Sequence, residues 1–167
     1  MNQQEEGTYE DKTTCRWASQ RDLLERGPNE YLKRLTPYAK VDIEEVDDLP
    51  SKKGDSLAEM EEVKNKENEK ILAKIKPNDF VILLDLGKEQ PDSVELSSRL
   101  DKWMRDGGSS ITFVIGGSLG LSSEMRKRGN ATLTLSKMTF THQMTRIILL
   151  EQIYRSFKIL HNEPYHK

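Results

Sequence analysis

Two uninterrupted apolar runs stand out in the pattern of hydrophobic and polar positions along the chain. The first covers Phe80–Leu84 and the second covers Ile111–Ile115. A strand that is covered on both faces needs no polar side, so such runs are typical of buried strands in a parallel sheet. A third segment, "ATLTL" at residues 131–135, predicts another strand.

Apolar residues at helical spacing predict three long helices before, between and after these strands, over residues 56–75, 93–106 and 142–161. The segment "SSEMRKRG" predicts a short helix with Ser122 or Ser123 as its N-cap, and Thr141 suits the N-cap of the last helix. Upstream, "NEYLKRLTPYAK" predicts the end of a helix closed by Pro37, and residues 41–46 predict a short strand.

Strands and helices therefore alternate along the chain. This order predicts an α/β fold with a mostly parallel sheet and helices on both faces. The last predicted helix is apolar over a wider arc than one sheet face needs. The pattern leaves two interpretations open for it, burial against the sheet and pairing with a second copy of the chain.

The carboxyl ends of the three predicted strands carry the candidate site. Open α/β sheets bind ligands at this edge, and the loops here read "LLDLGK", "IGGSLG" and "LSKMTF". The glycines at 116, 117 and 120 permit close approach of the backbone. Their spacing is not that of a dinucleotide-binding loop, and the sequence holds no Gly-Lys-Ser/Thr for a phosphate-binding loop. A plain tight turn is the alternative interpretation of this glycine loop.

Composition and charge narrow the class. The 167 residues suit one domain, and no apolar run approaches the length of a membrane span. Cys15 is the only cysteine, and the Cys and His residues show no zinc spacing, so we expect a cytoplasmic protein without a metal site. The net charge is −2, yet residues 121–167 hold eight Lys and Arg against three Asp and Glu. This asymmetry fits a polyanion-facing end, or ordinary surface variation.

Three strings identify a known family. "FVIGGSLG", "LSKMTFTHQMTRIILLEQIYRSFKI" and the terminal "NEPYHK" closely resemble the RlmH family of bacterial rRNA methyltransferases, within the SPOUT superfamily. The resemblance runs from about Asn29 to Lys167 and implies a C-terminal trefoil knot, an exception to the usual unknotted topology. It also implies a homodimer and S-adenosylmethionine as the cofactor. The implied reaction is N3 methylation of pseudouridine 1915, which lies in a stem-loop of 23S rRNA, on the intact 70S ribosome.

The family motifs assign the cofactor contacts to the three loops. By this resemblance they fall at Leu84, at Gly116 with Gly117, and along the third loop at Leu135, Ser136, Lys137, Met138, Thr139 and Phe140. The chemistry agrees, since an adenine needs a dry slot with backbone hydrogen bonds and the methionine part needs close backbone approach.

The resemblance places the C-terminal tail at the mouth of the active site. His166 is of the residue type that most often acts as a general base, and Tyr165 can stack on or hydrogen-bond the target base. The alternative interpretation of the tail is a frayed terminus. The candidate RNA contacts are Arg126, Lys127, Arg128, His142, Arg146 and Lys167. The alternative interpretation of the basic run at 126–128 is a solvated surface helix. The alternative for His142 and Arg146, on the last predicted helix, is contact with a partner subunit.

The chain departs from the family at its beginning. Members begin with an apolar strand and a loop rich in Gly and Lys, whereas residues 1–28 match nothing in that pattern. We therefore divide the chain into an atypical, irregular segment 1–28 and a SPOUT methyltransferase domain 29–167. A shifted reading frame upstream of Asn29 explains the departure, and the nucleotide sequence of the gene tests it.

Two other functions fit the sequence less well. One is a non-catalytic or decayed relative that binds RNA or the ribosome, with an impaired N-terminal strand. The other is a small nucleotide-binding α/β protein. Calorimetry with S-adenosylmethionine separates the latter from the methyltransferase, and methyl transfer to purified ribosomes separates the former.

Overall fold

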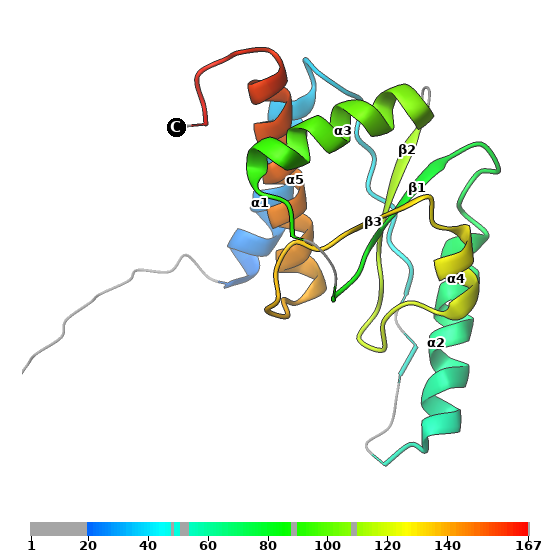
Figure 1. Cartoon of the computed structure of the whole chain (residues 1–167). Coiled ribbons are helices and arrows are strands. Elements are labelled where there is room, and N and C mark those ends of the chain that lie inside the picture. Colours follow the sequence, from blue (N-terminus) through cyan, green and yellow to red (C-terminus); the bar gives the residue numbers. More distant parts are fainter. Residues whose placement is uncertain (1–19, 48, 51–53, 88–89, 108–109, 167) are drawn as a thin grey trace, which may run out of the picture.

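The computed structural model describes residues 20–47, 49–50, 54–87, 90–107 and 110–166 (Figure 1). Five helices and three strands follow one another in the described chain, namely α1 Gln20–Leu35, α2 Leu57–Leu72, β1 Phe80–Leu84, α3 Ser93–Gly107, β2 Ile111–Ile115, α4 Ser123–Arg128, β3 Ala131–Leu133 and α5 His142–Leu160. Cys15 and Lys167, both singled out from the sequence, lie outside the described residues.

The three strands form a parallel sheet in the order β2-β1-β3. Leu84, the last residue of β1, is in register with Ile115 of β2 and with Leu133 of β3. The carboxyl ends of all three strands therefore lie at one edge of the sheet, and the loops that follow them leave from the same place. The predicted parallel sheet is confirmed.

Side chains of β1 alternate between two cores. Val81 and Leu83 point to the face covered by α2 and α4, where Met125 of α4 is fully buried. Ile82 points to the opposite face, into a larger core built from α1, α3 and α5. Figure 1 shows α5 running between α1 and α3, in agreement with the contacts of α5 with both helices. The prediction of helices on both faces is confirmed.

Local capping sets three helix starts as the sequence predicts. The Ser56 hydroxyl accepts a hydrogen bond from the backbone N–H of Glu59, whose carboxylate accepts one from Ser56 N–H in return. Ser122, rather than Ser123, is the N-cap of α4, and its buried hydroxyl accepts from Met125 N–H. Thr141 is the N-cap of α5.

The expected elements differ from the structure in three places. Residues 20–28 belong to α1 and are not irregular, because α1 packs along α5 and gains burial that the local sequence does not reveal. Residues 41–46 form no strand, since no described strand pairs with them and a strand needs a hydrogen-bonded neighbour. The third strand ends at Leu133, two residues early, where the chain turns into the site.

A buried carboxylate fixes the entry of β1 against β2. Asp79 is 9% exposed and accepts hydrogen bonds from the Ser110 hydroxyl at 2.7 Å and from Lys76 N–H at 2.9 Å. The Ser110 hydrogen bond is the largest cause that holds the pKa of Asp79 below its usual value, against the opposing effect of burial. Asp79 therefore stabilises the fold in its ionised form.

We expect this stabilisation to disappear in acid. The folded-state pKa lies below the unfolded value of about 4, so the contribution of Asp79 is present above that value and is lost as the pH falls through the folded pKa. Ser110→Ala should lower the free energy of unfolding at pH 7, and its difference from the wild type should shrink below about pH 4. Urea unfolding across this range measures it, with the exposed Ser118→Ala as the control. A difference independent of pH would contradict the assignment.

Candidate active site

The loops after the three strands are joined to one another beyond the sheet itself. Asp85, directly after β1, donates its backbone N–H to Leu133 O at 3.1 Å. The Thr134 hydroxyl, directly after β3, donates to Asp85 O at 2.8 Å. The first and third loops therefore leave the sheet as one unit, as expected from their position at the carboxyl edge.

The glycine loop after β2 folds back on itself. Gly120 has φ +81°, a conformation that L side chains rarely adopt, and its N–H donates to Gly117 O at 2.9 Å. A Cβ atom on Gly116 would lie 2.9 Å from Leu121, and one on Gly117 would lie 2.6 Å from the carboxylate of Glu67. A side chain at either position would therefore force these neighbours to shift, and the two glycines can offer a ligand only their backbone atoms.

Two neighbouring residues of α2 hold the glycine loop. Asn68 is fully buried, donates through Nδ2 to Gly120 O at 3.2 Å and accepts at Oδ1 from Ser122 N–H at 3.1 Å. Glu67 is 6% exposed, and its Oε1 accepts from Leu49 N–H at 2.8 Å. Helix α2, which carries no predicted site residue, thus sets the shape of the second loop.

Removing the Asn68 amide should weaken both the fold and the site. Asn68→Ala leaves the buried Gly120 carbonyl and Ser122 N–H without their partner, which costs about 1–3 kcal/mol for each unsatisfied group. We expect a matching loss in the free energy of unfolding, measured in urea, together with weaker cofactor binding in calorimetry. Asn65→Ala, on the same helix, is the control. Unchanged stability would show that the loop keeps its shape without α2.

The third loop exposes apolar side chains beside a cavity. Met138 is 68% exposed, whereas Leu135 and Phe140 are partly buried, and Ser136 accepts from Met138 N–H at 3.0 Å. Lys137 and Thr139 are exposed. A cavity of about 310 Å³ lies at the carboxyl end of β3, lined by Pro91, Asp92, Ser93, Leu96, Leu133, Thr134, Leu135, Ile148 and Gln152. Its size and mixed lining suit part of a small organic ligand.

Most of the described basic residues predicted to contact RNA already have partners. Arg126 forms an ion pair with Asp85, and Arg128 donates to the backbone carbonyls of Lys76 at 3.0 Å and Asp79 at 2.9 Å. Lys127 pairs with Glu124 at 2.7 Å on the exposed side of α4. Arg128 thus has a structural role in holding the turn before β1, and Arg126 ties α4 to the first loop.

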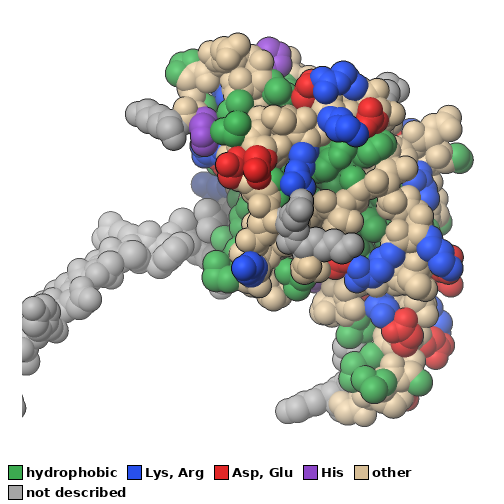
Figure 2. Space-filling model, viewed as in Figure 1, with side chains coloured by type: hydrophobic (Ala, Val, Ile, Leu, Met, Phe, Trp, Pro, Cys, Tyr) green, Lys and Arg blue, Asp and Glu red, His purple; other side chains and the backbone are tan. Residues whose placement is uncertain are grey.

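The two predicted contacts on α5 lie in its first turns. Arg146 forms an ion pair with Glu45, and His142 is the first residue of the helix and partly buried. Figure 2 shows positive and negative side chains interspersed on the visible face, with hydrophobic side chains exposed between them. On this face the basic residues do not form one uniform surface.

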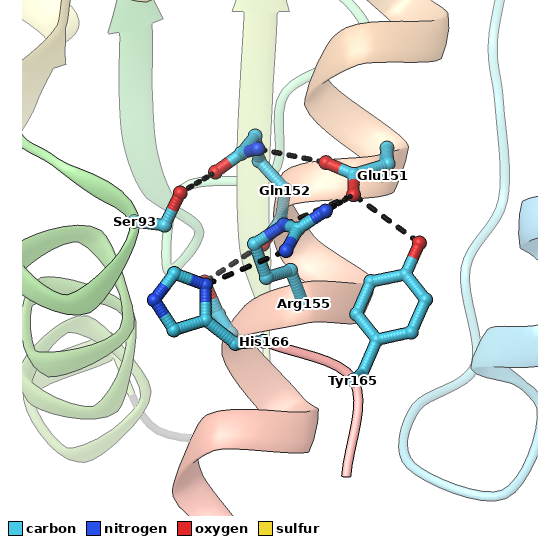
Figure 3. Close-up of polar contacts among 7 residues, drawn as sticks. Ser93, Glu151, Gln152, Arg155, Tyr165 and His166 are labelled. Atoms are coloured by element: carbon cyan, nitrogen blue, oxygen red, sulfur yellow. Dashed lines mark hydrogen bonds and ion pairs between the residues drawn. The ribbon is translucent and has the colours of Figure 1, made fainter.

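The C-terminal tail folds back onto α5 and is not frayed over its described residues. Tyr165 donates its hydroxyl to Glu151 Oε1 at 3.2 Å, and the Arg155 guanidinium stacks 4.7 Å from the centre of its ring. Arg155 also pairs with Glu151 and lies 3.4 Å from His166 Nδ1 (Figure 3). The two predicted tail residues are therefore brought together by two residues of α5.

A second set of contacts anchors the tail further upstream. Glu163 forms an ion pair with Lys158 and accepts a hydrogen bond from the Tyr38 hydroxyl at 2.5 Å. Asn162, with φ +53°, turns the chain back toward α5. The direction of the tail is thus fixed by the segment after α1 as well as by α5.

The surroundings of Tyr165 decide its protonation. Burial, followed by a hydrogen bond with Tyr31 and the negative charge of Glu151, raises the pKa of Tyr165 to about 12. Tyr165 is therefore a neutral phenol at physiological pH, able to donate a hydrogen bond but not to act as a base. The Arg155 guanidinium lies 3.4 Å from His166 Nδ1 and, since a guanidinium only donates, any hydrogen bond between them has Arg155 as its donor.

Glu151 and Arg155 were not among the candidate site residues predicted from the sequence. The signal that could have found them is their spacing, since acidic and basic residues four apart on a helix face one another. Both lie in the "LEQIYR" string that carries the family resemblance. Their side chains are 19% and 25% exposed, which is low for a surface ion pair and fits a site.

Two further properties bear on the class of protein. None of the described helices is both long and apolar enough to cross a membrane. Among the described residues, His, Cys, Asp and Glu form no group of three or more that could hold a metal ion. The described site therefore consists of loop backbone, apolar side chains, and a histidine, a tyrosine and an ion pair.

A parallel α/β sheet with three loops at its carboxyl edge is an architecture that binds ligands at that edge. The family described as "Predicted SPOUT methyltransferase" matches residues 16–166, and the chain belongs to this family of methyltransferases. Members of this family are enzymes that transfer a methyl group from a donor. The match begins upstream of Asn29, while the division of the chain at residue 28 and the trefoil knot stay predictions.

Curated relatives carry a more specific name. The chain is 48% identical over 144 residues to the "Ribosomal RNA large subunit methyltransferase H" of Desulforamulus reducens, covering 86% of this chain and 90% of the relative. It is 51% identical to the proteins of that name from Carboxydothermus hydrogenoformans and Bacillus thuringiensis subsp. konkukian, covering 86% of this chain and 91% of each relative.

Proposed function

We propose that the protein transfers a methyl group from S-adenosylmethionine to the N3 atom of a pseudouridine in a stem-loop of 23S rRNA, on the assembled 70S ribosome. The observation that carries the proposal is the convergence of three strand-end loops at one edge of the sheet in a chain about half identical to large-subunit rRNA methyltransferases. The pseudouridine, its N3 atom and the 70S context rest on the family resemblance. Ribosomal RNA as the substrate implies work in the cytoplasm.

The residues present fit such a cofactor. Leu84, Leu135 and Phe140 are partly buried at the carboxyl edge, and Met138 is exposed enough to close over an aromatic ring. The glycine loop would contribute backbone groups through Gly116 and Gly117, since their side-chain positions already face the protein. When bound, S-adenosylmethionine supplies an electrophilic methyl group on a sulfonium, which needs no metal.

The tail would act on the target base. Methylation at N3 requires loss of the N3 proton, and the imidazole of His166 is of the residue type suited to accept it. Tyr165, whose one hydroxyl proton is donated to Glu151, would stack on the target base, and the Arg155 cation would stabilise negative charge that develops on the ring. Glu151 holds both of these groups and so orients them.

A homodimer and an RNA-binding surface complete the proposal. Exposed apolar side chains gather around the site, at Leu86, Val94, Met138 and Met144, and a second copy of the chain would cover them. The proposed RNA contacts are Arg126, Lys127, Arg128, His142, Arg146 and Lys167. Four of them, Arg126, Lys127, Arg128 and Arg146, would exchange their present partners for RNA. The family fold also implies that the segment after β3 is threaded as a trefoil knot.

The main alternative is a non-catalytic relative that binds the ribosome. Transfer of labelled methyl from S-adenosylmethionine to purified 70S ribosomes separates the two, with free 23S rRNA and separated subunits as comparison substrates. We expect incorporation into 70S ribosomes. Calorimetric binding of S-adenosylmethionine without any methyl transfer would favour the non-catalytic relative.

A further inference from the structure

We propose that Ser93 and Gln152 are positioning residues that connect the cavity at the carboxyl end of β3 to the C-terminal tail. The proposal rests on the function proposed above and adds two residues to it. Figure 3 shows the contacts as one continuous path from α3 through α5 to the tail. The motifs that identify the family did not by themselves predict this connection.

The path consists of hydrogen bonds between neighbouring side chains. The Ser93 hydroxyl donates to Gln152 Oε1 at 2.9 Å, and Gln152 Nε2 donates to Glu151 Oε2 at 2.7 Å. Glu151 Oε1 then accepts from Arg155 Nε at 3.0 Å and from the Tyr165 hydroxyl at 3.2 Å. Arg155 in turn contacts His166 at 3.4 Å.

The chemistry of each group fixes which partner donates and which accepts in every hydrogen bond of the path. An ionised carboxylate only accepts hydrogen bonds, so the Gln152 amide must turn its nitrogen toward Glu151 and its oxygen toward Ser93. The serine hydroxyl is then required to donate. Gln152 occupies one oxygen of Glu151 and leaves the other to Arg155 and Tyr165. The orientation of the carboxylate, and with it the two groups of the tail site, depends on this amide.

The path begins at the wall of the cavity. Ser93 and Gln152 both line the space of about 310 Å³, together with Leu135 of the third loop. Ser93 is the first residue of α3, where the Asp92 side chain and Glu95 form a reciprocal cap that holds the helix start in place. A ligand against Leu135 would therefore sit beside the first hydrogen bond of the path, with Tyr165 and His166 at the other end.

The test compares two variants of the path with matched controls. Gln152→Leu removes the amide at similar size, and Ser93→Ala removes only the hydroxyl. The controls are Gln143→Leu in the first turn of α5 and Ser98→Ala on α3, both exposed residues outside the path. For each full-length variant, methyl transfer to 70S ribosomes gives kcat and the KM for S-adenosylmethionine, and thermal unfolding gives Tm. Two-dimensional NMR reports the Tyr165 and His166 ring signals.

We expect a loss in kcat without a loss in cofactor affinity. Hydrogen bonds to charged groups are the strong ones, so Gln152→Leu should lower kcat about tenfold and Ser93→Ala about threefold, with the KM for S-adenosylmethionine within about twofold of wild type. Both should shift the ring signals of the tail, and the two controls should do neither. Unshifted tail signals in both path variants would overturn the proposal, as would an effect confined to the KM for S-adenosylmethionine.

Failure of the proposed function has a different signature. A wild-type protein that transfers no methyl group refutes the proposed reaction, whereas the NMR comparison still tests the path in that case. Tail signals that shift in Gln152→Leu and Ser93→Ala but not in the controls would then support the connection without the reaction.

Discussion

Replacing His166 by alanine is expected to lower methyl transfer to ribosomes by about 100-fold or more, the usual contribution of a general acid or base. His166 lies in the C-terminal tail with its Nδ1 3.4 Å from Arg155, and it is not part of the three loops proposed to bind the cofactor. The loss should therefore appear in kcat, while the affinity for S-adenosylmethionine measured by calorimetry stays at the wild-type value.

His161→Ala is the matched control for this substitution. His161 is exposed, and it ends α5 with its ring nitrogen Nδ1 2.9 Å from Phe157 O, away from Glu151 and Arg155. Its replacement should leave kcat within about threefold of wild type, as for most surface substitutions. Unchanged turnover in His166→Ala would remove the residue from the mechanism.

Replacing Glu151 by alanine should affect turnover and stability together. Its carboxylate holds Arg155, Gln152 and Tyr165, and its loss leaves a guanidinium that is only 25% exposed without its partner. We expect a loss of about 1–3 kcal/mol in the free energy of unfolding and a fall in kcat of about 100-fold, because Tyr165 and Arg155 lose the carboxylate that positions them. Urea unfolding and methyl-transfer kinetics measure the two effects.

Glu124→Ala is the control for the loss of an acidic partner. Glu124 pairs with Lys127 in an exposed i,i+3 contact on α4, and pairs of this kind contribute little to stability. Wild-type turnover in Glu151→Ala would show that the tail reaches its working geometry without this carboxylate, and the role assigned to Tyr165 would then fail as well.

The sequence predicted the sheet well for a physical reason. Continuous apolar runs at Phe80–Leu84 and Ile111–Ile115 have no polar side to expose, so a covered parallel sheet was the one arrangement that suited both. Helix starts at Ser56, Ser122 and Thr141 were also legible, since capping depends on residues close in sequence. The strand expected at 41–46 failed because pairing depends on a distant partner.

The sequence predicted where the candidate site lies in the fold but not which contacts hold its residues. Parallel strands end at one edge, which was enough to bring the three loops together. The sequence did not reveal that side chains at Gly116 and Gly117 would also meet Leu121 and Glu67, and backbone contact of these glycines with a ligand stays a prediction. Asp85, the partner of Arg126, and the Lys76 and Asp79 carbonyls that accept from Arg128 lie at least 41 residues away, a separation at which no local pattern signals a contact.

The C-terminal tail shows this limit of prediction from sequence more clearly. Its terminal Tyr-His pair was recognised from the family motif, but the residues that hold it come from three other segments. Glu151 and Arg155 lie on α5, Tyr38 follows α1, and Ser93 begins α3. These residues come together only when α5 packs between α1 and α3, and no single stretch of sequence predicts that packing.

The most direct test of the central claim is methyl transfer by the purified full-length protein from labelled S-adenosylmethionine to 70S ribosomes that lack the modification. The product is located by nuclease digestion and mass spectrometry of the 23S rRNA. Our account predicts one methyl group per ribosome, carried on N3 of a single pseudouridine and absent when His166→Ala replaces the wild type. A wild-type protein that leaves these ribosomes unmethylated, or that methylates a different base, would contradict it.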